Sequence, residues 1–387
     1  MKKYISLLRR FITYYILWRA AFLLGRLRPV DKSLAVFAYN KNYSRIPDNL
    51  LCVKNELEKA GFECVEYRSP ASAKKRFIAD TKFQLLYARC GVVFLNDNFD
   101  PVCANKPRKG TRVVQLWHGC GAFKKFGYST LESAWGGDKK EWKLFPRHNT
   151  YTDVFVSAEK VIPCYAEAFN CSEDIIKPLG TPRTDVFFDS GFVESGRQKL
   201  LEAMPEIGDR RVILYAPTFR GSNPDDAHND DVIDFEKFRV LSEKCVIVLK
   251  YHPFTAKKCG FDGEQKEKFG DFVYLCPENI GIDTALCAAD MVISDYSSLI
   301  FEYSLLKRPM IFFAYDLEKY DRERSYYFKY EDFVPGPIVK SDDELIDVIL
   351  SGVDMRKIGD FREEFMSACD GRSTERIADY IINTLKN

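Results

Sequence analysis

The chain has 387 residues, of which 46% are hydrophobic, so it is long and apolar enough for two domains with sizeable cores. Its 57 basic and 56 acidic residues leave a net charge of only +1, which excludes a strongly basic nucleic-acid-binding protein and an acidic disordered chain. The 12 cysteines, Cys259 among them, are scattered without a CxxC pair. This usage favours a reduced cytoplasmic protein and predicts no metal site.

Residues 1–30 predict an amphipathic helix with seven cations and no carboxylate. Its apolar residues, from Tyr4 to Phe22, fall on one side of a helical projection, and Lys2, Lys3, Arg9 and Arg10 fall on the other. The longest uncharged run, Phe11 to Trp18, is far shorter than the ~20 residues of a transmembrane helix. The pattern indicates a helix lying on an anionic membrane surface. The alternative is a helix that packs on a domain and keeps its basic face in water.

The rest of the chain alternates short apolar runs with helical patterns, which predicts an α/β fold with parallel sheets. One helix is expected over 49–60, ending before Gly61, and another over 298–307, ending before Pro309. The expected strands are 34–37, 92–95, 113–116, 154–156, 212–215, 246–249, 272–275, 291–293 and 310–313. We therefore expect two Rossmann-like doubly wound domains facing a cleft, with boundaries at 1–30, 31–200 and 201–387.

Ligands of such sheets bind at the carboxyl ends of strands, so the loops that follow the apolar runs are the candidate sites. In the first half, Trp117, His118 and Gly119 follow a strand, and Lys124 and Lys125 come soon after. A histidine there can act as a general base near neutral pH. The alternative is a structural turn with a hydrogen-bonded histidine.

In the second half, cations and hydroxyl groups follow three strands. Thr218 and Arg220 could hold a phosphate, and Lys250 and His252 fall on one face of a strand. Asp295, Ser297 and Ser298 precede a helix that the serines could cap, and Asp295 could orient a histidine or bind a hydroxyl. An edge-strand polar pair and a plain helix cap are the structural alternatives. We find no dinucleotide fingerprint, P-loop or GxSxG motif.

Together these loops resemble the CDP-glycerol glycerophosphotransferase family of teichoic-acid primases and polymerases. The resemblance runs from about residue 112 to 340. Its motifs are Trp117-His118-Gly119 with Lys124 and Gly127; Leu179-Gly180-Thr181-Pro182-Arg183-Thr184-Asp185; Tyr215-Ala216-Pro217-Thr218-Phe219-Arg220; Leu249-Lys250-Tyr251-His252-Pro253; Ser294-Asp295-Tyr296-Ser297-Ser298; and Asp316, Tyr320 and Arg324 before Pro335-Gly336-Pro337. The resemblance implies a GT-B fold, peripheral attachment to the cytoplasmic face of the membrane, and important histidines at His118 and His252.

The implied enzyme moves an alditol phosphate from CDP-glycerol or CDP-ribitol to a hydroxyl of a lipid-linked saccharide or polymer, releases CMP and needs no cofactor. His118 would be the general base, and His252 the second catalytic histidine. The donor would be held by Thr218, Arg220, Lys250, Asp295, Ser297, Ser298 and Arg324. Gly119, Lys124 and His148 would lie on the acceptor side, although a structural role for His148 is equally compatible with the sequence. The alternatives are a GT-B glycosyltransferase that uses a nucleotide sugar and a non-catalytic membrane scaffold.

Overall fold

The structure is a computed structural model that describes residues 2–131, 133, 136–221, 226–230, 232–252, 255–256, 260–261 and 263–386. Pro253 and Cys259 lie outside the described residues, as do the side chains of Lys2 and Lys3. The chain divides into two compact units. Unit 1 comprises 1–185 and 367–387, and unit 2 comprises 186–366. The expected domain boundary near 200 therefore needs correction to 185, and the last 21 residues return to the first unit.

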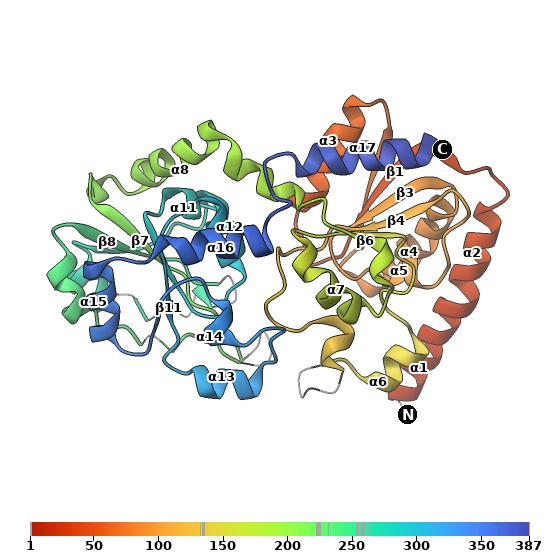
Figure 1. The fold of residues 1–387 in the computed structure, drawn as a ribbon. Helices are drawn as coiled ribbons and strands as arrows, with labels where there is room; N and C mark the ends of the chain where they lie inside the picture. The colour runs from red at the N-terminus through yellow and green to blue at the C-terminus, as the bar shows by residue number, and fades with distance from the viewer. Residues whose placement is uncertain are drawn as a thin grey trace. The chain divides into compact units, whose positions relative to one another are not determined.

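Unit 1 is built on a parallel sheet with the strand order β2-β1-β3-β4-β5-β6. Its strands are β1 (Asp31–Tyr39), β2 (Glu63–Arg68), β3 (Cys90–Leu95), β4 (Arg112–Gln115), β5 (Asp153–Phe155) and β6 (Ile176–Lys177). Its longer helices are α3 (Asp48–Lys59), α4 (Ala73–Tyr87), α5 (Asp100–Cys103), α6 (Lys139–Leu144), α7 (Ile162–Phe169) and α17 (Ser373–Lys386). In Figure 1, α17 lies beside α3 near β1, and both helices contribute to one apolar core.

Unit 2 has its own parallel sheet, in the order β12-β11-β10-β7-β8-β9. Its strands are β7 (Arg211–Tyr215), β8 (Cys245–Leu249), β9 (Val273–Leu275), β10 (Met291–Ser294), β11 (Met310–Phe313) and β12 (Ile338–Val339). Its helices are α8 (Ser190–Ala203), α9 (Phe235–Phe238), α10 (Gly263–Phe269), α11 (Ile282–Ala288), α12 (Leu299–Leu305), α13 (Leu317–Glu323), α14 (Tyr330–Phe333), α15 (Asp342–Ser351) and α16 (Met355–Phe365). This is the strand order of the Rossmann fold, and the order reverses between β7 and β10.

The expected strands and helices are confirmed to within a few residues. The helix expected over 49–60 is α3, and Gly61 after it has a φ of 86°, the left-handed conformation of a helix-ending glycine. Three strands were not predicted: β6 and β12, which have two residues each, and β2. The sequence of β2 alternates acidic and basic residues with apolar ones and lies at the edge of the sheet, so it has no continuous apolar run.

The N-terminal segment is one helical rod made of α1 (Lys2–Ile12), the π-helical η1 (Thr13–Leu17) and α2 (Trp18–Gly25). The rod packs on unit 1 through the buried side chains of Tyr14, Trp18 and Phe22, and α2 lies against α4. A second apolar stripe, which we call the outer stripe, remains exposed. It consists of Tyr4, Leu8, Ile12, Ile16, Leu23 and Leu27. The expected single apolar face is therefore divided into a packed face and an exposed one.

Candidate active site

The loop that carries His118 leaves β4 through a strained residue. Trp117 has a φ of 57°, which is unfavourable for a bulky side chain and persists only where the surroundings hold it. Its N–H donates to the side-chain oxygen of Gln115 over 2.9 Å, and its carbonyl accepts from the side-chain amide of Asn49 over 2.8 Å. Both amides are buried, so they fix the backbone from which the next residue, His118, projects.

Aromatic rings support the same loop. The indole of Trp117 stacks on Phe126 with ring centres 5.0 Å apart and meets Phe169 edge-on at 5.2 Å. Gly127, which the sequence motif includes, has a φ of 59°, and a Cβ there would lie 2.1 Å from the carbonyl oxygen of Ala168. Only glycine fits at this position, so the loop can close over the aromatic cluster.

His118 itself is exposed, unlike the residues that hold it. Desolvation by the surrounding protein lowers the pKa of His118 below its ordinary value, while the charge of Asp97 and a hydrogen bond to the backbone of Asn96 raise it. The charge of Arg183 lowers it further. The imidazole is therefore neutral at neutral pH and can accept a proton, which is what a general base must do.

The other acceptor-side candidates differ in their exposure. Gly119 is half-buried, and its carbonyl accepts a hydrogen bond from Tyr165 over 3.2 Å. Lys124 is also half-buried. His148 is 3% exposed, has a φ of 56°, and its Nδ1 lies 2.7 Å from the hydroxyl of Tyr151. Burial, with the charge of Arg147, lowers the pKa of His148 to about 3, so it is a neutral packing residue in this structure.

The motif at 179–185 connects the His118 loop to the end of the chain. The backbone N–H of Arg183 donates to the side-chain oxygen of Asn49 over 2.9 Å, so Asn49 holds this segment and Trp117 together. The carboxylate of Asp185 accepts from the N–H groups of Ser373 and Thr374 at 2.9 and 2.8 Å, which caps α17.

In unit 2 the candidate residues after β7 and β10 meet where the strand order reverses, which is the usual ligand position in such sheets. Asp295 is the centre of this cluster. Its Oδ1 accepts from the N–H groups of Thr218 and Tyr296 at 2.8 and 2.6 Å, and its Oδ2 accepts from Arg220 over 3.0 Å. Asp295 is 2% exposed, so it joins the two loops rather than presenting a carboxylate to solvent.

Arg220 is also buried, and two carboxylates hold it. Its Nε and Nη2 bind the carboxylate of Asp316 at 2.8 and 3.0 Å, and its Nη1 binds Asp295. The guanidinium also lies over the rings of Tyr296, Tyr315 and Tyr320. The two carboxylates raise the pKa of Arg220 above its ordinary value. Arg220 was predicted to contact the donor phosphate, whereas its geometry favours a positioning role for the loop after β7.

The remaining donor-side candidates surround this cluster. The hydroxyl of Thr218 is buried and has no hydrogen-bond partner among the described residues. The ammonium of Lys250 donates to the carbonyl of Ile280, and the ring of His252 lies 4.9 Å from that of Phe219. Arg324 donates to the carbonyl of Gly221 over 3.0 Å.

The expected capping of α12 by both serines needs correction. The helix begins at Leu299, and the side chain of Ser298 makes no capping hydrogen bond. The hydroxyl of Ser297 accepts from the N–H of Leu299 at 3.4 Å, which is a long contact. Ser298 is exposed instead.

Sequence reasoning missed the residues that hold the site together. Asn49, Gln115 and Asp97 were not singled out, and Asp316 was noted only within the family motif. Asn49 lies in the helix α3, far along the chain from the loops that it joins. Gln115 did carry a signal, since it is a polar residue inside an otherwise apolar strand run.

The fold and these loops define a GT-B-like α/β transferase with two Rossmann-like units. Residues 21–383 match the CDP-glycerol:poly(glycerophosphate) glycerophosphotransferase family. The chain belongs to this family, and it is an enzyme of the transferase class. The resemblance inferred from the motifs is thus confirmed.

Individual relatives agree with this assignment. The chain is 39% identical to the teichoic acid ribitol-phosphate primase of Bacillus spizizenii over 302 residues, which are 77% of this chain and 76% of the primase. It is 34% identical to the teichoic acid poly(ribitol-phosphate) polymerase of the same species, over 95% of this chain and 59% of the polymerase. Among solved structures, the wall teichoic acid polymerase TagF has a similar fold, with a TM-score of 0.75 at 22% identity over 99% of this chain and 96% of the TagF chain.

Proposed function

We propose that the protein transfers an alditol phosphate from a CDP-alditol to a primary hydroxyl of a lipid-linked acceptor and releases CMP. The observation that carries this proposal is the exposed, neutral His118 on a rigid loop of a chain that belongs to a CDP-glycerol-dependent family. Phosphoryl transfer depends mostly on positioning and charge stabilisation, which suits a site built from rigid strand ends.

The proposed step is a displacement at the β-phosphorus of the donor. The acceptor hydroxyl oxygen forms the new P–O bond while its proton passes to His118. The bond between the β-phosphorus and the bridging oxygen breaks, and CMP leaves with that oxygen. A positioned base of this kind contributes about 10²–10⁴-fold to the rate.

Unit 2 would bind the donor. We assign direct contacts to the hydroxyl of Thr218 and to Lys250, His252, Ser297, Ser298 and Arg324. Asp295 and Arg220 would act by holding the loop of Thr218 in place. Gly119 and Lys124 would contact the acceptor from unit 1. The buried hydroxyl of Thr218 has no partner among the described residues, and this supports the assignment, because such a group gains a partner when an acceptor-rich diphosphate binds.

Ribitol phosphate is the donor group that we favour. The four relatives named as ribitol-phosphate primases or polymerases are 32–39% identical to this chain, whereas the glycerol-phosphate enzymes are 26–29% identical. The chain as a whole is thus more similar to the ribitol-phosphate enzymes, which supports ribitol phosphate as the donor group.

The test is CMP release in the presence of membranes that carry the lipid-linked acceptor. We expect release with CDP-ribitol, less with CDP-glycerol, and none with a UDP-sugar. Sizing of the labelled lipid product then separates transfer of one unit from polymerisation. Sugar transfer from a UDP-sugar without reaction of either CDP-alditol would overturn the proposal, and so would absence of any transfer.

We also propose that the outer stripe attaches the protein peripherally to the cytoplasmic membrane face. Leu8, Ile12 and Ile16 are 60%, 38% and 54% exposed, and the cations Arg19 on the rod and Arg26 and Arg28 directly after it are exposed as well. None of the described helices is long and apolar enough to cross a membrane. An exposed apolar stripe flanked by cations fits a helix that lies in the headgroup region.

The sharpest test replaces the exposed residues and leaves the packed ones. Deleting the rod would also remove Tyr14, Trp18 and Phe22 from the core. We expect the Leu8→Ser, Ile12→Ser, Ile16→Ser triple variant to move from the membrane pellet to the supernatant. The matched control, Val240→Ser, Leu350→Ser, Met355→Ser, changes exposed apolar residues of unit 2 and should still pellet. Equal pelleting of both variants would contradict the attachment.

A further inference from the structure

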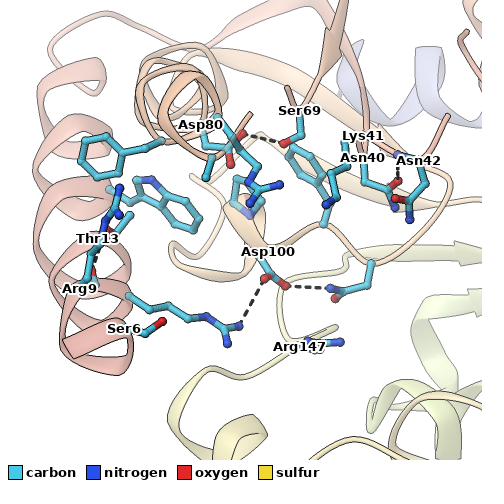
Figure 2. A pocket seen from close by; sticks show the side chains of 18 residues that line it. Ser6, Arg9, Thr13, Asn40, Lys41, Asn42, Ser69, Asp80, Asp100 and Arg147 are labelled. Carbon is cyan, nitrogen blue, oxygen red and sulfur yellow. Dashed lines mark hydrogen bonds and ion pairs between the residues drawn. The ribbon is translucent and has the colours of Figure 1, made fainter. Parts of the chain in front are cut away.

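Unit 1 contains a cavity of about 630 Å³ between the N-terminal rod and the sheet. Figure 2 shows Ser6, Arg9 and Thr13 of the rod on one side, and Asn40 and Lys41 from the loop after β1 on the other. Asn98, Phe99 and Asp100, which follow β3, complete the wall. No residue of this cavity belongs to the catalytic or donor-binding set described above.

The position of the cavity matches a ligand site. In the sheet of unit 1 the strand order reverses between β1 and β3, and the cavity lies at the carboxyl ends of these two strands. Ligands of open α/β sheets bind outside the carboxyl ends of strands at such a reversal. The sheet of unit 2 has its candidate donor residues at the equivalent place, between β7 and β10.

The charge of the cavity favours an anion. Five cations line it, Arg9, Arg10, Lys41, Arg76 and Arg147, against two carboxylates, Asp80 and Asp100. Arg10 is neutralised by ion pairs with Asp100 and Glu141. Within the described residues the other four cations form no ion pair within 4.0 Å of a carboxylate. The charge of Arg76 acts on Asp80, so Arg9, Lys41 and Arg147 are the cations of the cavity that no carboxylate of the described residues offsets.

Unpaired polar atoms point to the kind of ligand. Trp18 is 8% exposed, and its indole N–H has no hydrogen-bond partner among the described residues. The Nε of Arg147 and the side-chain oxygen of Asn98 are also buried and have no hydrogen-bond partner in the part of the chain that the structure describes. Two of these three atoms are donors, and a buried donor without a partner costs free energy. A ligand with several acceptor oxygens, such as a phosphate or a diphosphate, would satisfy these two donors.

The neighbourhood of the cavity connects it with both the membrane helix and His118. The rod that supplies Arg9 and Thr13 carries the exposed outer stripe on its other side. The segment that supplies Asn98 and Asp100 begins with Asn96 and Asp97, two of the three residues that act on the pKa of His118. A ligand held here would have an apolar helix on one side and the candidate base one loop away.

We propose that this cavity binds the diphosphate of the lipid-linked acceptor and orients the acceptor toward His118. The inference rests on the proposed function for the identity of the lipid. The diphosphate oxygens accept from Trp18 and Arg147 and face Arg9, Lys41 and Arg76. The lipid chain runs from the cavity to the membrane along the outer stripe. The cavity thereby selects a lipid with a compact, doubly phosphorylated headgroup.

The test measures binding of the full chain, without donor, to phosphatidylcholine vesicles that contain either a polyprenyl diphosphate or phosphatidylglycerol at equal negative charge. We expect at least about tenfold tighter binding to the polyprenyl diphosphate vesicles, since a bidentate phosphate contact exceeds general attraction. Equal affinity for both vesicles would overturn the proposal in favour of general lipid phosphates.

Matched charge variants separate the cavity from general attraction. Arg9→Gln, Arg147→Gln removes two cavity cations. The matched pair Arg19→Gln, Arg26→Gln removes two exposed cations outside the cavity, one on the rod and one directly after it. We expect the first pair alone to abolish the preference for polyprenyl diphosphate. An equal loss in both double variants would overturn the proposal.

Trp18→Phe provides a test that preserves the packing, because the ring stays and only the N–H is lost. We expect about 3- to 10-fold weaker binding to the polyprenyl diphosphate vesicles at an unchanged melting temperature. Unchanged affinity would contradict the role of the indole. These binding outcomes are independent of CMP release. Normal CMP release without cavity-dependent binding would refute only the role of the cavity in binding the acceptor. Cavity-dependent binding without CMP release would refute only the proposed transfer reaction.

Discussion

The two candidate loops of this protein are held in place by different chemistry. In unit 1, neutral amides and aromatic rings fix Trp117, and His118 beside it stays exposed and titratable. In unit 2, a buried arginine between two carboxylates fixes the loop of Thr218. The charges that act on His118, Asp97 and Arg183, shift its pKa in opposite directions. The neutral groups around Trp117 thus hold the backbone beside a titratable base, whereas the charged scaffold holds a loop that only has to stay rigid.

The largest expected effect concerns the exposed histidine. His118→Ala should lower kcat by about 10²–10⁴-fold with little change in donor affinity, because the variant loses the proton acceptor and keeps the donor unit. Steady-state CMP release and donor titration measure the two quantities. His228→Ala, which removes an exposed histidine of unit 2, is the control. A His118→Ala enzyme with normal turnover would refute the assigned base.

The two scaffolds should differ in their sensitivity to truncation. Arg220→Met should lower the free energy of unfolding by about 3–5 kcal/mol, because it leaves Asp295 and Asp316 buried without a counter-charge. Gln115→Met removes a neutral partner and should cost about 1–3 kcal/mol. Urea denaturation of both variants gives the comparison. Equal losses would mean that charge does not distinguish the scaffolds.

His148 should make the neutral scaffold sensitive to acid. Its folded pKa of about 3 lies below the ordinary value near 6.5, so the unfolded chain binds the proton more tightly. Stability from this group is complete above pH 6.5 and falls as the pH drops toward 3, by about 2 kcal/mol at pH 5. His148→Asn, which tolerates the positive φ, should remove that slope between pH 8 and pH 5. An unchanged slope would place the acid sensitivity elsewhere.

The smallest expected effect is a shift of the pH profile. Since the base must be neutral, kcat/KM should fall as the pH drops through the lowered pKa of His118. Asp97→Asn removes a charge that raises this pKa and should move the acidic limb to lower pH. Arg183→Gln should move it to higher pH. Shifts in the same direction would contradict the electrostatic account.

Much of the fold could be predicted from the sequence because its central strands are continuous apolar runs buried on both faces. The edge strand β2 was not predicted because its exposed residues are charged and interrupt the apolar pattern. The candidate loops were located because they follow those strands. The partners of Arg220 could not be found in this way, since Asp295 and Asp316 lie 75 and 96 residues away and only the fold brings them together.

The division of the N-terminal rod into a packed face and an exposed face was not predicted from the helical projection either. The sequence placed Trp18 and Ile16 on one apolar side, but two residues separate them by about 200° on a regular helix. Trp18 accordingly packs inward while Ile16 stays exposed. The apolar residues of the rod cover too much of its circumference for a single face, so which of them pack on unit 1 is decided by the fold.

The last helix has a consequence for the order of synthesis. The core of unit 1 includes Ile377, Ala378 and Ile381 of α17, and Asp185 holds the start of that helix. All residues of unit 2 leave the ribosome before α17 does. Unit 2 can therefore fold during translation before unit 1 is complete. Until α17 is synthesised, some 190 residues after Asp185, the apolar surface of unit 1 that α17 covers stays accessible to chaperones.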